Sequence, residues 1–262
     1  MEPWYGSVAT VARTLWRFQG VKITVTGAEN VPPSGGAVVA INHTGYLDFA
    51  FAGLAAYDNH PRRRVRFMAK KETFDNRFTG PIMRGCRHIA VDRSQGADAY
   101  AAAVEYLRAG ELVGVYPEAT ISRSFELKEF KSGAARMAIE AQVPIIPHIV
   151  WGAQRIWTKD HPRRLGRSKV PISVVVGEPI PPTLPVDDLR ALLQTRMQHL
   201  LEQAQDAYPE HPADAFWVPH RLGGGAPTPA EALRLDAEEA ARKAEERAAR
   251  HQQPPSATGA AE

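Results

Sequence analysis

Cysteine is almost absent from this sequence: Cys86 is the only one among 262 residues. A single cysteine excludes an internal disulfide and any zinc or iron–sulfur site built from cysteines, and it favours a reducing compartment. Long apolar runs are missing too: Asp48 interrupts the longest one, 37–57, whereas a membrane-spanning helix needs about 20 apolar residues. The first 19 residues lack the cationic and apolar segments of an export signal. We therefore expect neither a transmembrane helix nor export.

Several common catalytic motifs are missing as well. The sequence contains no G-x-S-x-G nucleophile elbow, no G-x-x-x-x-G-K phosphate loop, no strand-linked G-x-G-x-x-G and no H-E-x-x-H. The sequence therefore offers no sign of a nucleophile-elbow hydrolase, a P-loop nucleotide site, a dinucleotide site or an H-E-x-x-H zinc site. Any catalytic site must be built from other residues. The composition, with 44% hydrophobic and 23% charged residues, is that of an ordinary globular protein.

Positive charge is concentrated in two segments, although the net charge is only +3. Residues 62–93 carry ten cations and three acids, and residues 155–169 carry six cations and one acid, Asp160. Each segment has two interpretations. It is either a solvated basic face or a surface that attracts the phosphates of lipids, nucleotides, nucleic acid or a phosphopantetheine carrier.

The N-terminal segment, 1–20, has the pattern of an amphipathic helix. Trp4, Val8, Val11, Leu15 and Phe18 recur at spacings of four and three residues, which places them on one helical face. Two interpretations are open for this aromatic-rich face: it covers the protein's own core, or it lies in a membrane interface.

Strand-like and helix-like segments alternate from residue 21 onward, which predicts an α/β domain over 21–221 with a mixed, largely parallel sheet flanked by helices. The expected strands are 21–26, 37–41, 111–116, 143–150 and 170–176, and the expected helices are 99–108, 132–142 and one that begins at Asp187 or Asp188. Beyond it, 222–262 is expected to be a Gly/Pro linker and a charged tail, either helical or disordered.

A candidate general base follows the buried strand 37–41. His43 and Asp48 form the only H-x-x-x-x-D pair in the chain. A carboxylate on one ring nitrogen fixes the tautomer of a histidine and leaves the other nitrogen free to take a proton. The spacing permits this contact if the chain turns from strand to helix here. Taken alone, the pair also fits a structural histidine in a turn.

Four ordered blocks together resemble the glycerolipid acyltransferase family, which includes the 1-acylglycerol-3-phosphate acyltransferases. The blocks are Asn42-His43-Thr44-Gly45-Tyr46-Leu47-Asp48; Lys70-Lys71-Glu72 with Gly85-Cys86-Arg87-His88-Ile89-Ala90-Val91-Asp92-Arg93; Tyr116-Pro117-Glu118-Ala119-Thr120; and Val143-Pro144-Ile145-Ile146-Pro147. The resemblance covers roughly residues 20 to 180.

The resemblance implies a role for each block. His43 takes a proton from a glycerol hydroxyl that attacks an acyl thioester, and Asp48 orients His43. Arg93 binds phosphate, although it also has Asp92 or solvent as possible partners. Glu118 and Thr120 bind the polar acceptor, and the alternative for Glu118 is a carboxylate that caps a loop. The apolar block 143–147 fits either the core or a wall for the acyl chain.

The third block departs from the Glu-Gly-Thr-Arg of the family, because Ala119 stands at the glycine position and Ile121 at the arginine position. The cations that follow are candidates to replace that arginine: Arg123, Lys128 and Lys131. Gly45 stands where serine is common in the first block, a change that we do not expect to touch the base.

The resemblance implies an enzyme of phospholipid synthesis, peripheral on the cytoplasmic face of the cell membrane. It implies acyl transfer from acyl-CoA or acyl carrier protein to 1-acylglycerol-3-phosphate, giving phosphatidic acid, with no metal or organic cofactor. The expected partners are an anionic membrane surface, a lysophospholipid acceptor and the acyl donor, and not nucleic acid. Two alternatives remain: another lysophospholipid or glycolipid acceptor, and a non-catalytic basic membrane-binding module.

Overall fold

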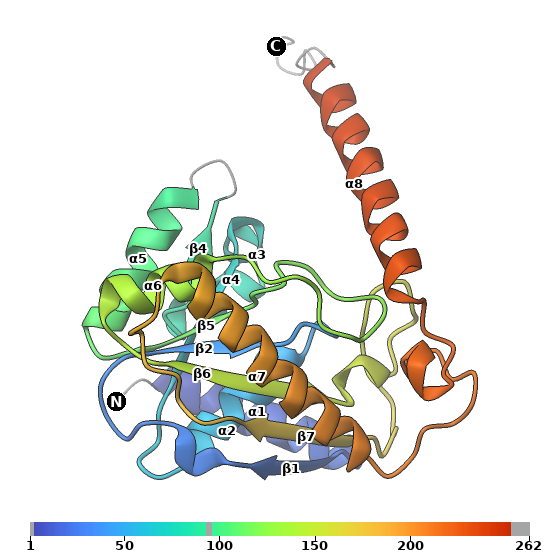
Figure 1. The fold of residues 1–262 in the computed structure, drawn as a ribbon, viewed down its shortest axis with the longest axis horizontal. Helices are drawn as coiled ribbons and strands as arrows, with labels where there is room; N and C mark the ends of the chain where they lie inside the picture. The colour runs from blue at the N-terminus through green and yellow to red at the C-terminus, as the bar shows by residue number, and fades with distance from the viewer. Residues whose placement is uncertain (1–2, 93–95, 253–262) are drawn as a thin grey trace, which may run out of the picture. The chain divides into compact units, whose positions relative to one another are not determined.

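The computed structural model describes residues 3–92 and 96–252, and the chain forms two compact units, Met1–Glu210 and His211–Glu262. The first unit is built on a seven-stranded sheet with the order β1-β7-β6-β2-β5-β3-β4 (Figure 1). Its strands are β1 (Lys22–Thr26), β2 (Ala37–Ile41), β3 (Val65–Lys70), β4 (Ile89–Val91), β5 (Leu112–Val115), β6 (Ile145–Trp151) and β7 (Pro171–Val176).

Parallel pairing dominates the sheet. The only antiparallel pair among the named strands joins β6 to β7, so β1 and β7 run against the other five strands. Strand β2 lies between β5 and β6 and is buried at every position. A continuous apolar run is what a strand with both faces covered requires. The predicted α/β class with its largely parallel sheet is confirmed.

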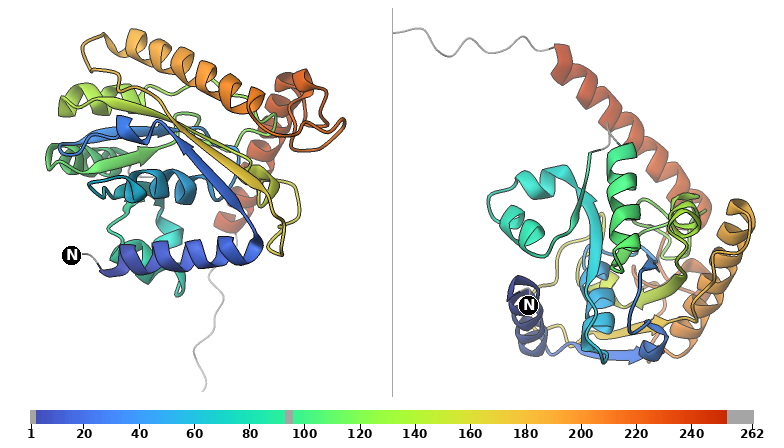
Figure 2. Two further views of the ribbon diagram at one scale, coloured as in Figure 1. Left: turned by 90° about the horizontal axis from the view of Figure 1, so that it is seen from below. Right: turned by 90° about the vertical axis from the view of Figure 1, so that its left-hand side faces the viewer.

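Helices cover both faces of the sheet (Figure 2). The helices α5 (Gly96–Arg108), α6 (Gly133–Ala141) and α7 (Val186–Asp206) pack on one face, and α2 (Asp48–Asp58) packs on the other. The short helices α3 (Lys71–Asp75) and α4 (Thr79–Gly85) follow β3. Short 3-10 turns complete this unit: η1 (Ala28–Asn30) and η2 (Ala153–Arg155).

Helix α1 (Pro3–Gln19) forms an outer layer on the side of α2. Its buried apolar residues are Tyr5, Ala9 and Trp16, and the ring of Trp16 stacks on Phe51 of α2 with 4.2 Å between centroids. Most of the apolar face that the spacing identified is exposed: Trp4, Val11, Leu15 and Phe18. The helix therefore has one apolar side against the core and another that the first unit leaves open. In the described part of the chain, no helix has the length and apolarity to span a membrane.

The second unit contains η3 (His220–Leu222) and the long helix α8 (Pro229–Gln252). Helix α8 begins with a capping box, in which Thr228 and Glu231 bond each other's backbone amides. Along its exposed side it carries ion pairs between residues four apart, such as Arg234 with Glu238. The tail is thus helical over these residues, and the domain boundaries at 20/21 and 221/222 remain predictions.

Candidate active site

Three parallel strands bring the candidate residues to one edge of the sheet. Strands β2, β5 and β6 are neighbours and run in the same direction, so their carboxyl ends lie side by side. His43 follows the end of β2, Glu118 follows β5, and Trp157 lies in the segment after β6. Crevices at the carboxyl ends of parallel strands are the usual ligand sites of such sheets.

The carboxylate of Asp48 is the centre of the site. Asp48 is fully buried at the first residue of α2. Its Oδ2 accepts hydrogen bonds from the backbone amides of Thr44 and Gly45, each at 2.8 Å, and lies 3.2 Å from Nδ1 of His43. An oxygen that already accepts from two amides is an acceptor for the ring as well, so Nδ1 carries the proton and Nε2 is left as the base.

Burial and hydrogen bonding shift the pKa of Asp48 in opposite directions. Burial raises the pKa of its carboxyl above the usual 3.8, and the bonds from His43, Gly45 and Thr44 lower it again. The net direction is upward because the group is cut off from water. The hydrogen bonds from His43, Gly45 and Thr44 therefore offset part of the cost of burying this carboxyl.

The ring of His43 is held on a second side by Tyr116. The two rings stack with centroids 3.8 Å apart and planes 16° from parallel. The His43 side chain is 17% exposed, so part of the ring still faces outward. Tyr116 was part of the third sequence block without a role. Nothing in its spacing identified the stacking, which depends on β2 and β5 pairing in parallel.

Glu118 connects the backbone of His43 to a neighbouring loop. Its Oε1 accepts from the His43 amide at 2.8 Å and its Oε2 accepts from the Lys128 amide at 3.0 Å, while the side chain is only 3% exposed. Burial raises the pKa of the Glu118 carboxyl to about 8. These contacts match the loop-capping interpretation of Glu118, and its contact with an acceptor remains a prediction.

The other predicted binding residues lie at different depths. Thr120 is exposed and accepts a hydrogen bond from Nζ of Lys128 at 2.6 Å. Arg123 is buried, with Nε 2.6 Å from Oδ2 of Asp160, and Lys131 is exposed. Arg93 lies outside the described residues. The structure thus brings His43, Asp48, Glu118 and Thr120 together with Lys128, which the sequence offered as one of three cations.

The segment after β6 supports the first block from the other side. The amide of Tyr46 donates to the carbonyl of Trp157 at 3.0 Å, and the hydroxyl of Thr158 donates to the carbonyl of Thr44 at 2.6 Å. The side chain of Asn42 forms a similar clamp just before the block turns, with bonds to both backbone groups of Val150. Sequence spacing carries no signal for these contacts, because they join residues more than 100 positions apart.

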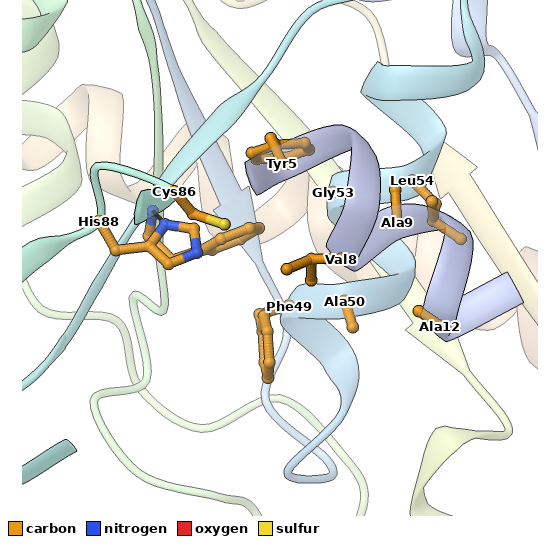
Figure 3. Close-up of a pocket in the computed structure, with 11 residues that line it drawn as sticks. Tyr5, Val8, Ala9, Ala12, Phe49, Ala50, Gly53, Leu54, Cys86 and His88 are labelled. Atoms are coloured by element: carbon orange, nitrogen blue, oxygen red, sulfur yellow. Dashed lines mark hydrogen bonds between the residues drawn. The ribbon is translucent and has the colours of Figure 1, made fainter. Parts of the chain in front are cut away.

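An apolar pocket of about 60 Å³ lies between α1 and α2 (Figure 3). Phe49 and Ala50, the two residues after Asp48, form one part of its wall, and Val8 and Ala12 of α1 form another. The remaining lining residues are Tyr5, Ala9, Gly53, Leu54, Phe67, Cys86 and His88. Within the described ranges no cluster of three or more His, Cys, Asp or Glu side chains is placed to hold a metal ion.

Comparisons with known proteins find similarity to acyltransferases. A family model described as Acyltransferase matches residues 22–151, which include His43, Asp48 and Glu118. The chain is 29% identical over 165 residues to 1-acyl-sn-glycerol-3-phosphate acyltransferase of Bacillus subtilis, covering 62% of this chain and 74% of that protein. It is 31% identical over 184 residues to 1-acyl-sn-glycerol-3-phosphate acyltransferase alpha of Homo sapiens, covering 69% of this chain and 62% of that protein.

A solved structure shares the fold. The crystal structure of the 1-acyl-sn-glycerophosphate acyltransferase PlsC from Thermotoga maritima superposes with a TM-score of 0.61 and 20% identity, covering 76% of this chain and 81% of that one. The match to the family model assigns residues 22–151 to the acyltransferase family. Another relative, a Mycobacterium leprae protein described as uncharacterized, is 31% identical over 146 residues, and the match spans 38% of its length.

The pKa of Glu118 predicts a pH dependence of stability. A carboxyl whose pKa rises from 4.5 to about 8 on folding contributes stability at low pH that is lost as the pH rises through this window. Glu118→Gln removes this titration. We compare the unfolding free energy of the wild type with that of Glu118→Gln. As the pH rises between 4.5 and about 8, we expect the wild-type value to fall relative to the variant by up to about 1.4 kcal/mol per pH unit.

Urea unfolding at pH 5 and pH 7.5 measures this difference. The exposed residue Glu178 provides the control, because Glu178→Gln changes the charge without removing a buried carboxyl. A difference between wild type and Glu118→Gln that is the same at both pH values contradicts the prediction.

The geometry at Gly45 predicts that serine is not tolerated there. A Cβ atom on Gly45 lies 2.8 Å from the carbonyl oxygen of Trp157, which is backbone and has little freedom to move. Gly45→Ser is therefore expected to destabilise the protein by about 1–3 kcal/mol, and to lower activity because Gly45 holds Asp48. Thermal unfolding and turnover measure the two effects. Gly166→Ser is the control, since its Cβ has no neighbour within 4 Å, and equal behaviour of the two variants would refute the prediction.

Proposed function

We propose that this protein transfers a fatty acyl group from acyl-CoA or acyl carrier protein to the free hydroxyl of 1-acylglycerol-3-phosphate, giving phosphatidic acid. The observation that carries the proposal is the His43–Asp48 pair, with Nδ1 3.2 Å from a buried carboxylate that two backbone amides already hold. The names of the Bacillus subtilis and human relatives support the choice of acceptor.

The proposed reaction needs a base and no covalent intermediate on the enzyme. Nε2 of His43 takes the proton of the acceptor hydroxyl while its oxygen attacks the thioester carbonyl. The C–S bond then breaks, and the thiolate leaves with the proton that His43 returns. Asp48 stabilises the imidazolium between these two steps. No metal ion or organic cofactor is required by this sequence of proton transfers.

The apolar pocket between α1 and α2 supports a hydrocarbon substrate. Phe49 and Ala50, which follow Asp48 at the start of α2, are among the residues that line it. A site lined almost entirely by aliphatic and aromatic side chains favours a chain of methylene groups over a polar ligand. We assign a few methylene groups of one substrate's acyl chain to this pocket. Ile145 and Ile146 of the fourth block are fully buried in the sheet, so they pack in the core.

A thiol-release assay with palmitoyl-CoA tests the proposal. We expect release with 1-acylglycerol-3-phosphate, and a loss of about 100-fold or more in kcat for His43→Ala. His199→Ala is the matched control, because His199 lies on α7 with its side chain 70% exposed. Release with a zwitterionic lysolipid and not with 1-acylglycerol-3-phosphate would overturn the acceptor, and undiminished release by His43→Ala would overturn the base.

We also propose that the exposed side of α1 docks on an anionic membrane. Val11, Leu15 and Phe18 are 68%, 50% and 75% exposed. The side chain of Gln19 donates to the carbonyl of Leu165 in the loop between β6 and β7. Leu165 is 53% exposed, so the loop adds an apolar residue beside this end of the helix. Cations surround Leu165 in the sequence and are exposed: Arg163, Arg164 and Arg167.

Apolar side chains flanked by cations are suited to an anionic lipid interface, where each Lys or Arg contributes about 1 kcal/mol of attraction. We expect the double change Leu15→Ser with Phe18→Ser to abolish sedimentation with vesicles that contain phosphatidylglycerol. Thermal unfolding should not change, because both side chains are exposed. Leu184→Ser, at a partly exposed leucine ahead of α7, is the control. Vesicle binding that persists in the double variant would refute this orientation.

A further inference from the structure

The backbone of His43 is fixed at both of its polar groups. Its amide donates to Oε1 of Glu118 at 2.8 Å, and its carbonyl accepts from the amide of Ser122 at 2.8 Å. The ring can then move only by rotation about its two side-chain torsions. The contact between Nδ1 and Oδ2 of Asp48 is 3.2 Å long, at the upper end of the usual range, and it holds one edge of the ring. A single bond of this kind leaves the plane of the ring to be set by another contact.

Tyr116 supplies that contact. The planes of the Tyr116 and His43 rings are 16° from parallel and their centroids are 3.8 Å apart, which is closer than the roughly 4.5–7 Å of most aromatic pairs. A stack as close as this covers one face of the imidazole, and tilting of the His43 ring toward that side would bring the two rings into collision. The contact with Asp48 and the stack therefore restrict different motions of the same side chain.

The position of Tyr116 is itself well determined. It follows the last residue of β5, which pairs with Ala40 of β2, so the ends of the two strands lie side by side. Its carbonyl accepts from the Ala119 amide at 3.0 Å, and the proline that comes next disfavours a helical backbone at Tyr116. At the far end of the side chain, the backbone of Phe49 bonds the hydroxyl. The ring thus reaches from the end of β5 to the start of α2, the helix that carries Asp48.

We propose that Tyr116 is a positioning residue for acyl transfer, which acts by holding the plane of the His43 ring. The inference rests on the proposed function, because that function gives His43 the role of base. The direction of Nε2 matters for such a base, since it must lie within hydrogen-bonding distance of the hydroxyl from which it takes the proton. When His43 carries the extra proton, the imidazolium lies over the face of Tyr116, an arrangement that cation–π attraction stabilises. Tyr116 therefore acts through His43, and it needs no contact with either substrate.

Two substitutions separate the ring of Tyr116 from its hydroxyl. Tyr116→Phe keeps the stack, and we expect its kcat to stay within about threefold of wild type. Tyr116→Leu removes the stack, and we expect kcat to fall about 10- to 30-fold, the factor by which a desolvated cation–π contact changes an equilibrium. Both KM values should stay within about twofold. Tyr100→Leu is the matched control, because Tyr100 is a partly exposed tyrosine whose hydroxyl also bonds, to Glu140 of α6.

Nuclear magnetic resonance reports the position of the His43 ring without turnover. A proton above the face of an aromatic ring resonates upfield, and the signal of the Cε1 proton of His43 is identified by its loss in His43→Ala. We expect this signal to lie upfield in wild type and in Tyr116→Phe, and to return downfield in Tyr116→Leu. Thermal unfolding checks that each variant is folded. Tyr116→Met, with a flexible apolar side chain, serves the same test where Tyr116→Leu unfolds.

Three results overturn the inference: a kcat for Tyr116→Leu equal to that of wild type, a rise in KM with kcat unchanged, or a His43 signal that is the same in wild type and Tyr116→Leu. Equal losses of kcat in Tyr116→Phe and Tyr116→Leu overturn it as well, because they assign the effect to the hydroxyl. If no acceptor is acylated, the proposed function fails, and the His43 signal alone decides whether Tyr116 positions the ring.

Discussion

The buried carboxylate of Asp48 is the constraint from which the local structure of the site follows. A charge with no exposure is expensive unless hydrogen bonds replace its water. Here Oδ2 collects two backbone amides and the imidazole, and the start of α2 adds the favourable end of its dipole. To deliver both amides to one oxygen, residues 44–47 must turn tightly between β2 and α2. The same turn aims His43, so the carboxylate that contacts the His43 ring also fixes where that ring lies.

Glu118 is a second buried carboxyl, and it contacts a different part of His43 from Asp48. Asp48 contacts the ring of His43, whereas Glu118 contacts only its backbone amide and reaches the Lys128 amide with its other oxygen. The negative charge of Asp48 adds to burial in raising the pKa of Glu118. The two groups lie at the ends of adjacent parallel strands, β2 and β5. The parallel register therefore places one carboxyl against the ring of His43 and another against the backbone of the loop that carries Lys128.

How much the sequence could predict depends on the range of each interaction. Strand β2 was predicted with its correct bounds, because a short apolar run that follows a Gly/Pro turn is typical of a fully buried strand. Strand β3 was missed because Arg66 lies within it, buried and paired with Glu111 of a distant segment. The His43–Asp48 pair was recognisable because five residues separate its members. The Tyr116 stack and the Lys128–Thr120 contact depend on how loops return to the sheet edge, which no local pattern encodes.

The loop between β6 and β7 shows how the membrane orientation and the chemistry are connected. These strands are antiparallel neighbours, for which a turn of a few residues is sufficient, yet residues 152–170 intervene. Long connections of this kind in compact domains are usually functional. Here one part of the loop bonds the first block through the Trp157 carbonyl, and another bonds the end of α1 through the Leu165 carbonyl. In the proposed orientation, the loop therefore connects the end of α1 that faces the lipid to the turn that follows His43.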